Sequence, residues 1–247
     1  MNPPPVSHGR LKLRVSPRRI TLARLIEFLA TELEDFPGWQ QLESNRNENY
    51  YNQNLNRFLQ IRARDKCDAV QFDREIEHDS PGAHDIGTFP ADEIGLIVRG
   101  RKFRPREPIY TMECKRLPSP VGSRQREYLT SESGHPPRGG VQRYKMGIHG
   151  AGLDDAGIIG YVEEGTPEAW QRKINGWVDQ LIRNPVDSTV VWKSADRLKP
   201  YSGVKKGKRV RVSKSECIRV QAGKTRLTHF HVNMKLGAQI ELAFPGQ

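Results

Sequence analysis

Apolar residues recur at helical spacing in three segments of the chain. The first helix begins after Thr21, a residue type that caps helices, and "DFPGW" at 35–39 ends it. The second runs from about Asn47 to Arg62, and the third starts at Thr166, where Pro167 follows the cap. The three apolar faces consist of Leu22, Leu25, Ile26, Leu29 and Leu33, then Tyr51, Leu55, Phe58 and Leu59, then Trp170, Ile174, Trp177 and Leu181.

Shorter segments that alternate apolar and polar residues, or are apolar throughout, predict strands. They are 69–77, 83–89, the segment ending at 110–112, and 156–162, followed after residue 186 by "STVVWKS", "KRVRVSKS", "ECIRVQA" and "THFHVNMKL". A short helix is expected over 141–150, a basic loop over 99–108 and a Gly-, Ser- and Pro-rich loop over roughly 118–140. The order helix, three strands, helix, strand, helix and further strands predicts an α/β fold with a central mixed sheet.

The chain of 247 residues is long enough for one sizeable core with an extension. We expect a loose basic segment over 1–19 and a core with its N-terminal helix over 20–185. A β-rich basic extension over 186–247 is expected to pack on the same domain.

The charge balance indicates an anionic partner. Net charge is +11 and the sequence pI is about 9.7, which favours nucleic acid over a chain that is merely basic and soluble. There is no apolar run long enough for a transmembrane helix, and the N-terminus lacks the apolar centre of a signal peptide. Cys67, Cys114 and Cys217 are isolated, which fits neither a disulfide framework nor a zinc site. A cytoplasmic protein is therefore expected.

The segment "YTMECKRLP" at 110–118 ends a predicted buried strand with an acid and a base. Because side chains alternate along a strand, Glu113 and Lys115 point to the same side. Taken alone, the triplet is either an ion pair or half of a metal-dependent site.

Two further carboxylates are candidates for the same site. On its predicted helix, Glu48 lies on the core-facing stripe with Leu55 and Leu59, so it is either paired or metal-bound, or solvated at a frayed helix end. Asp85 in "HDIGTF" lies just inside a strand, and Asp92 in "FPADEIGLIV" is a competing candidate. Asp85 could instead simply bond its own backbone after a turn.

In this order of elements, Glu48, Asp85 in "HDIGTF", "MECKR" and the "VQRYK" helix resemble the PD-(D/E)xK, or restriction-endonuclease-like, nuclease superfamily over roughly residues 44–183. The family core is helix, three strands, helix, strand. One departure from the motif is His84, which stands where the family has proline before the aspartate.

The resemblance implies a metal-dependent phosphodiesterase. Asp85, Glu113 and the Cys114 carbonyl would hold Mg²⁺, or Mn²⁺ in its place, and Glu48 would assist a second metal or its water shell. Lys115 would orient or deprotonate the attacking water. Gln142 and Tyr144 resemble the motif that supports the lysine or contacts the phosphate, with ordinary helix packing as the alternative.

Basic residues are the candidates for contact with phosphates. The two runs are Arg101, Lys102, Arg104 and Arg106, and Lys205, Lys206, Lys208 and Arg209, at least one of which is expected to be a solvated loop. His229 and His231 share one strand face and lack the further ligands of a zinc site.

We therefore expect a Mg²⁺-dependent nuclease, an endonuclease acting on DNA in bacterial or archaeal antiviral defence or restriction, alone, as a homodimer or with a defence-complex partner. The alternative is a catalytically inactive subunit that binds nucleic acid or a partner protein. The sequence leaves open DNA against RNA, sequence specificity, endo- against exonuclease cleavage, the oligomeric state and the identity of the strand aspartate.

Overall fold

A seven-stranded mixed sheet forms the centre of the protein, seen here in a computed structural model that describes residues 16–39, 47–76, 84–132, 135–221 and 223–235. The strand order is β2-β3-β6-β7-β10-β9-β8. Strands β6, β7 and β10 are parallel, and every other neighbouring pair is antiparallel. The strands are β2 (Val70–Ile76), β3 (His84–Pro90), β6 (Tyr110–Leu117), β7 (Asp155–Val162), β8 (Lys199–Pro200), β9 (Val210–Ile218) and β10 (Lys224–Asn233).

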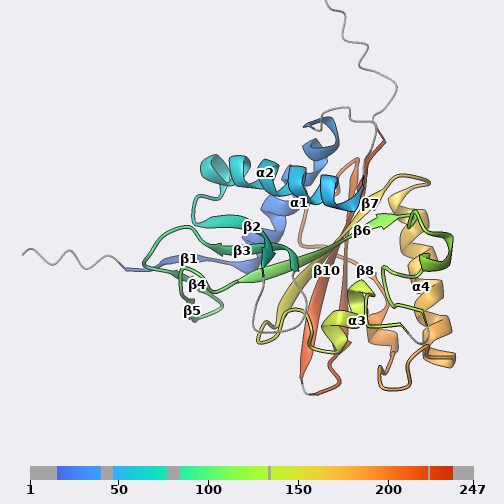
Figure 1. Cartoon of the computed structure of the whole chain (residues 1–247). Helices are drawn as coiled ribbons and strands as arrows, with labels where there is room; N and C mark the ends of the chain where they lie inside the picture. Colours follow the sequence, from blue (N-terminus) through green and yellow to red (C-terminus); the bar gives the residue numbers. More distant parts are fainter. Residues whose placement is uncertain (1–15, 40–46, 77–83, 133–134, 222, 236–247) are drawn as a thin grey trace, which may run out of the picture.

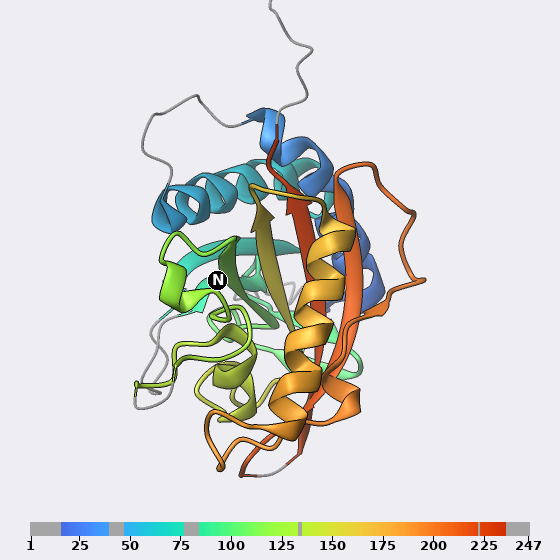
Figure 2. The same cartoon turned by 90° about the vertical axis from the view of Figure 1, so that its right-hand side faces the viewer.

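Helices cover both faces of this sheet. Helices α1 (Leu22–Trp39) and α2 (Glu48–Lys66) lie on one face, and α3 (Gly140–Lys145) and α4 (Pro167–Arg183) on the other (Figures 1 and 2). Two short 3₁₀ helices, η1 (Gly122–Arg124) and η2 (Ser194–Asp196), lie in connecting segments. Each face has its own hydrophobic cluster, so the prediction of a mixed α/β fold is confirmed.

The predicted helices form with the expected faces and caps. All the residues of the three apolar stripes are buried, and the side chains of Thr21, Asn47 and Thr166 accept backbone N–H groups of the first turns. Helix α1 ends at Trp39, the last residue of the predicted end "DFPGW" at 35–39, so Pro37 lies inside the helix. Pro37 lies in the last turn, where few backbone bonds remain to be lost, and Phe36 is fully buried there.

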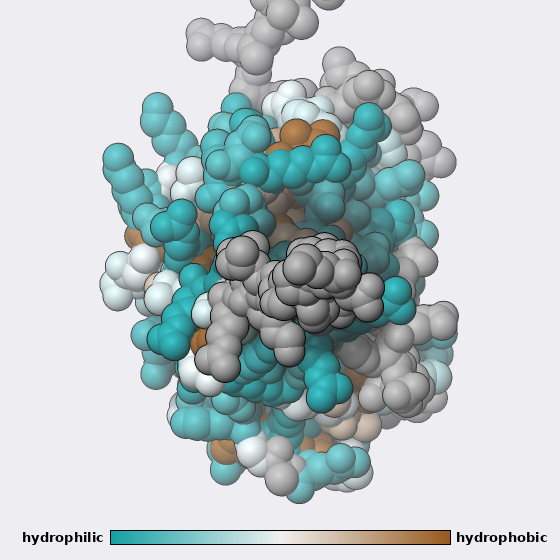
Figure 3. All heavy atoms as spheres, turned by 90° about the vertical axis from the view of Figure 1, so that its left-hand side faces the viewer, coloured by the Kyte–Doolittle hydropathy of each residue, from teal (hydrophilic) through white to brown (hydrophobic). Residues whose placement is uncertain are grey.

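A small second sheet has the order β1-β4-β5 and consists of β1 (Arg18–Ile20), β4 (Leu96–Val98) and β5 (Arg101–Phe103). It corrects two expectations, because residues 18 and 19 are not loose and the basic segment 99–108 begins as a hairpin. Arg99 and Gly100 have φ values of 50° and 82°, as a tight hairpin turn requires. Viewed from this end, the visible surface is mostly hydrophilic (Figure 3).

The segment "STVVWKS" is a loop and not a strand. Val190 and Trp192 are buried and Val191 is exposed, so the alternation is real, but within the described residues no strand pairs with this segment. The predicted strands "KRVRVSKS" and "ECIRVQA" form one strand, β9. Among the described residues, no helix combines the length and apolar character needed to cross a membrane.

The C-terminal strands are integral to the main sheet. Strand β10 lies between β7 and β9, and its register aligns Leu117, Val162, Asn233 and Arg209 in one row across four strands. The carboxyl ends of β6, β7 and β10 therefore meet at one end of the molecule, together with the start of β9.

Candidate active site

Strand β6 divides its side chains between the two layers. Cys114 packs into the cluster under α1 and α2, and Leu117 into the cluster under α3 and α4. Glu113 and Lys115 lie four and two positions before Leu117, so their side chains point to the same face of the sheet as Leu117. Both are buried. The Cys114 thiol is fully buried, which raises its pKa well above the usual range, so a thiolate role for it is excluded.

Asp85, and not Asp92, is brought to Glu113. The ladder between β3 and β6 ends at the pair Ile86 and Met112, and the same register continued by one residue places Asp85 opposite Glu113. Asp85 Oδ2 accepts the Cys114 N–H at 2.7 Å. Asp92 Oδ1 accepts the N–H groups of Ile94 and Gly95 at 3.0 and 3.1 Å, which makes it a turn residue.

Glu113 is surrounded by three basic side chains. Its Oε1 lies 2.9 Å from Lys115 Nζ and 3.1 Å from Arg143 Nη1, and its Oε2 lies 3.0 Å from Nδ1 of the buried His149. Arg143 and His149 were not among the site residues predicted from the sequence. Both lie in or just after the "VQRYK" helix, but only the packing of α3 against β6 brings them to the carboxylate.

Glu48 reaches Lys115 from the other layer. It is the first residue of α2, after the cap Asn47, and its Oε1 lies 3.2 Å from Lys115 Nζ. Its side chain is 35% exposed, so it is neither fully buried nor free in water. Lys115 therefore bridges two carboxylates, one from the helix and one from the strand.

The charges in the site shift one another's pKa values. Burial, and then the neighbouring Glu113, raises the pKa of Asp85 to about 8. Burial alone would raise the pKa of Glu113, but Lys115, His149 and Arg143 together lower it below the usual range. Burial would lower the pKa of Lys115, but Glu113, Glu48 and Asp85 raise it, so the lysine is a stable ammonium.

Gln142 and Tyr144 are buried, and their hydrogen bonds go to the protein scaffold. Gln142 Oε1 accepts the N–H and the hydroxyl of Ser131 at 2.9 and 3.0 Å. The Tyr144 hydroxyl donates to the carbonyls of Thr111 and Gly157 at 3.3 and 3.0 Å. These contacts are those of ordinary helix packing, the alternative interpretation of both residues. Arg143, which lies between them in the sequence, is the residue whose side chain contacts Glu113.

The two basic runs lie at opposite ends of the sheet. Arg101 donates to the carbonyl of Gly152, which precedes β7, so the first run lies beside the amino ends of β6 and β7 (Figure 1). The second run precedes β9, whose start is level with Leu117. Since neighbouring strands lie about 4.8 Å apart, three strand spacings place it roughly 14 Å from β6. The residues concerned are Arg101, Lys102, Arg104 and Arg106 in the first run, and Lys205, Lys206, Lys208 and Arg209 in the second.

His229 and His231 are buried in the sheet. Nδ1 of His229 lies 2.8 Å from the Tyr128 hydroxyl and Nε2 lies 2.8 Å from Ser215 Oγ. His231 has no hydrogen-bond partner at either ring nitrogen within the described part of the chain.

The oxygen donors at this site fit a hard divalent cation. Asp85 and Glu113 supply carboxylates and Cys114 a backbone carbonyl, and the like charges that raise the pKa of Asp85 would be relieved by Mg²⁺. Across the described residues, no three or more His, Cys, Asp or Glu side chains gather closely enough to hold a metal. A cation here would therefore depend on two carboxylates and main-chain oxygen.

A cavity of about 230 Å³ opens beside Glu48 and Lys115. Arg116 and Tyr128 also line it. The buried Lys115 thus lies at the wall of this cavity.

Comparisons of the chain with protein-family models, curated proteins and solved structures found no significant match.

Proposed function

We propose that the protein is a Mg²⁺-dependent nuclease that hydrolyses phosphodiester bonds in DNA. The observation that carries the proposal is that Asp85 lies beside Glu113 while Lys115 contacts Glu113 and Glu48. The order α2, β2, β3, β6, α3, β7 also matches that of a restriction-endonuclease-like core. The net charge of +11 favours a polyanionic substrate.

The acidic and basic side chains of the site would have different roles. Asp85, Glu113 and the Cys114 carbonyl would hold Mg²⁺, which when bound lowers the pKa of a water molecule and screens the phosphate. Because its pKa is raised, Lys115 would act as a positive hydrogen-bond donor at the phosphate and not as a base. Arg143 supplies a second cation on the same carboxylate, and Glu48 holds Lys115 in place.

Two matched aspartate variants test the assignment. Asp85→Asn removes a proposed metal ligand, and Asp92→Asn makes the same change in a turn. In the presence of Mg²⁺, we expect Asp85→Asn and Lys115→Ala each to lower the cleavage rate of plasmid DNA by roughly 10²–10⁴-fold. Asp92→Asn should cut at the wild-type rate. Cleavage by Asp85→Asn and Lys115→Ala at the wild-type rate would refute this site.

A second function is favoured by one observation. Both oxygens of Glu113 are already held by basic groups, as in a permanent ion-pair cluster of an inactive nucleic-acid-binding subunit. Calorimetry separates the two functions. Heat of Mg²⁺ binding that disappears in Asp85→Asn supports the nuclease, whereas DNA binding without any Mg²⁺ binding supports the inactive subunit.

A further inference from the structure

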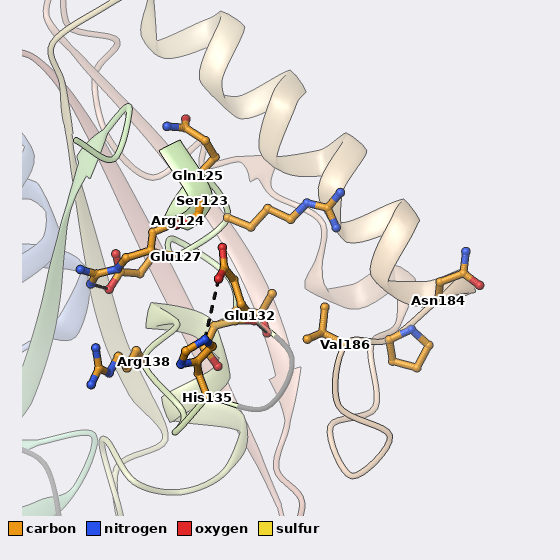
Figure 4. Close-up of a pocket in the computed structure, with 13 residues that line it drawn as sticks. Ser123, Arg124, Gln125, Glu127, Glu132, His135, Arg138, Asn184 and Val186 are labelled. Atoms are coloured by element: carbon orange, nitrogen blue, oxygen red, sulfur yellow. Dashed lines mark hydrogen bonds and ion pairs between the residues drawn. The ribbon is translucent and has the colours of Figure 1, made fainter. Parts of the chain in front are cut away.

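A larger cavity of about 780 Å³ lies next to the candidate active site. This volume is within the range of about 300–1,000 Å³ that is typical of ligand pockets. Its walls come from the segment around η1, from Thr130, Ser131, Glu132, His135 and Arg138, and from residues 184–186 directly after α4 (Figure 4). Glu132 and His135 face each other on one side, and Asn184 and Val186 lie on the opposite side (Figure 4).

The two cavities share a wall. Arg124, Gln125 and Glu127 line both the large cavity and the smaller one that contains Lys115 and Glu48. Arg124 and Glu127 pair with each other across this boundary. A nucleic-acid strand bound at Lys115 would therefore place its next nucleotide at the large cavity.

The floor of the large cavity, which here means the wall that includes Glu127, Thr130 and Ser131, is hydrogen-bonded to α3. The N–H groups of Gly140 and Gln142 in α3 donate to the carbonyls of Glu127 and Leu129 at 3.0 and 2.8 Å. Gln142 also accepts two hydrogen bonds from Ser131, which lines the cavity. Since α3 also carries Arg143 to Glu113, the cavity and the site are connected through α3.

The floor also needs a glycine. A Cβ on Gly139 would lie 2.2 Å from the Cα of Thr130, so any other residue would push the floor away from α3. The cavity is therefore a built feature of the fold and not a gap between loose loops.

The lining chemistry matches a nucleotide. Within the described chain, the exposed guanidinium groups of Arg126 and Arg138 make no ion pair or hydrogen bond, so they are available to a phosphate. Asn184 presents an amide, which can donate to and accept from base edges, whereas Gln125 Nε2 already donates to the carbonyl of Ser119 at 3.0 Å. Val186 adds an apolar surface for the flat face of a base.

We propose that this cavity binds the nucleotide of the substrate strand that flanks the cleaved phosphodiester, its phosphate held by Arg126 and Arg138 and its base by Asn184. The proposal rests on the proposed nuclease function for its choice of a strand over a free nucleotide. It assigns to the chain a subsite that is separate from the metal ligands.

The first experiment measures binding without catalysis. Affinity for a short fluorescein-labelled DNA single strand is measured by anisotropy in EDTA over a series of salt concentrations. Arg126→Ala with Arg138→Ala should weaken binding about tenfold and lower the salt slope by about 1 to 2. The matched control removes two exposed arginines outside both cavities, Arg64→Ala with Arg172→Ala. Equal losses in the two double variants would overturn the proposal.

The second experiment tests the base and the source of the nucleotide. An oligonucleotide with abasic sites should bind the wild type several-fold more weakly, and Asn184→Ala should bind intact and abasic strands alike. Equal binding of both strands by the wild type would overturn base recognition. Displacement of the labelled strand by free dAMP at the concentration of a competing unlabelled strand would assign the cavity to a free nucleotide and overturn the strand subsite.

These outcomes are independent of the proposed chemistry. If the wild type binds DNA as described but cuts neither DNA nor RNA with Mg²⁺ or Mn²⁺, the nuclease proposal fails and the nucleotide subsite stands. If it cuts DNA but the Arg126 and Arg138 variants behave like the control, the subsite alone fails.

Discussion

Glu113 shows how one residue acquires its character from distant parts of the chain. Lys115 is two positions away, but Arg143 and His149 are separated from Glu113 by 30 and 36 positions. Asp85 joins them through a register that fixes which residues face each other across two strands. The sequence indicated the acid and the lysine, and the tertiary structure selected Asp85 over Asp92 and added two basic side chains.

His231 gives a residue-level prediction on stability. Burial, and then Arg211, lowers its pKa to about 3, whereas an unfolded histidine titrates near 6.5. Between these two pKa values only the unfolded state binds the proton. The stability contributed by the neutral histidine is therefore present above about pH 6.5 and is lost as the pH falls toward 3. His231→Leu should therefore reduce the loss of unfolding free energy between about pH 6.5 and 5 by about 2 kcal/mol.

Denaturant unfolding at several pH values measures this effect. The exposed His135→Leu is the control and should change the pH dependence less than His231→Leu does. The same pH dependence in His231→Leu as in the wild type would contradict the cause assigned to the pKa shift.

At the level of elements, apolar spacing predicted most helices and strands because their buried faces repeat with a regular period. The segment "STVVWKS" shows where that signal stops. Val190 and Trp192 pack on the cluster under α4, and Lys145 lies over the Trp192 ring, yet none of the described strands pairs with the segment. An alternating pattern indicates which side chains are buried. A strand also needs a neighbouring strand to which its backbone can form hydrogen bonds.

Strand β7 carries an element-level prediction. A Cβ on Gly160 would lie 2.7 Å from Leu117 and 2.8 Å from His231, whereas Gly176 in α4 has open space around it. Gly160→Ala should destabilise the fold by about 1–3 kcal/mol through overpacking. Gly176→Ala should stabilise it by roughly 0.5–1 kcal/mol because alanine favours a helix. Chemical denaturation measures both, and a stabilising Gly160→Ala would contradict this packing.

At the level of the whole molecule, the fold places the two basic runs at different ends of the sheet, although both were predicted from the sequence as candidates for contact with phosphates. The second run lies at the same end of the sheet as Lys115, and the first at the opposite end. A nucleic acid bound at Lys115 can therefore extend across β7 and β10 toward the second run, over a distance of roughly 14 Å.

Matched triple variants test this path. Lys205, Lys206 and Lys208 changed to glutamine should lower the slope of log affinity against log salt by up to about 3. Lys102, Arg104 and Arg106 are equally exposed, and the same changes there should have less effect on binding. Larger losses from the first run than from the second would contradict the path and favour binding at the opposite end of the sheet.

The sequence by itself determined the helices with their caps and apolar stripes, most of the strands, the basic charge and the triplet that contains Glu113 and Lys115. These features are local, because period, capping and charge need only neighbouring residues. The tertiary structure decided strand order, the insertion of β10 between β7 and β9, the choice of Asp85, and the approach of Arg143 and His149 to Glu113. Those depend on register and on the packing of layers, which join residues far apart in the chain.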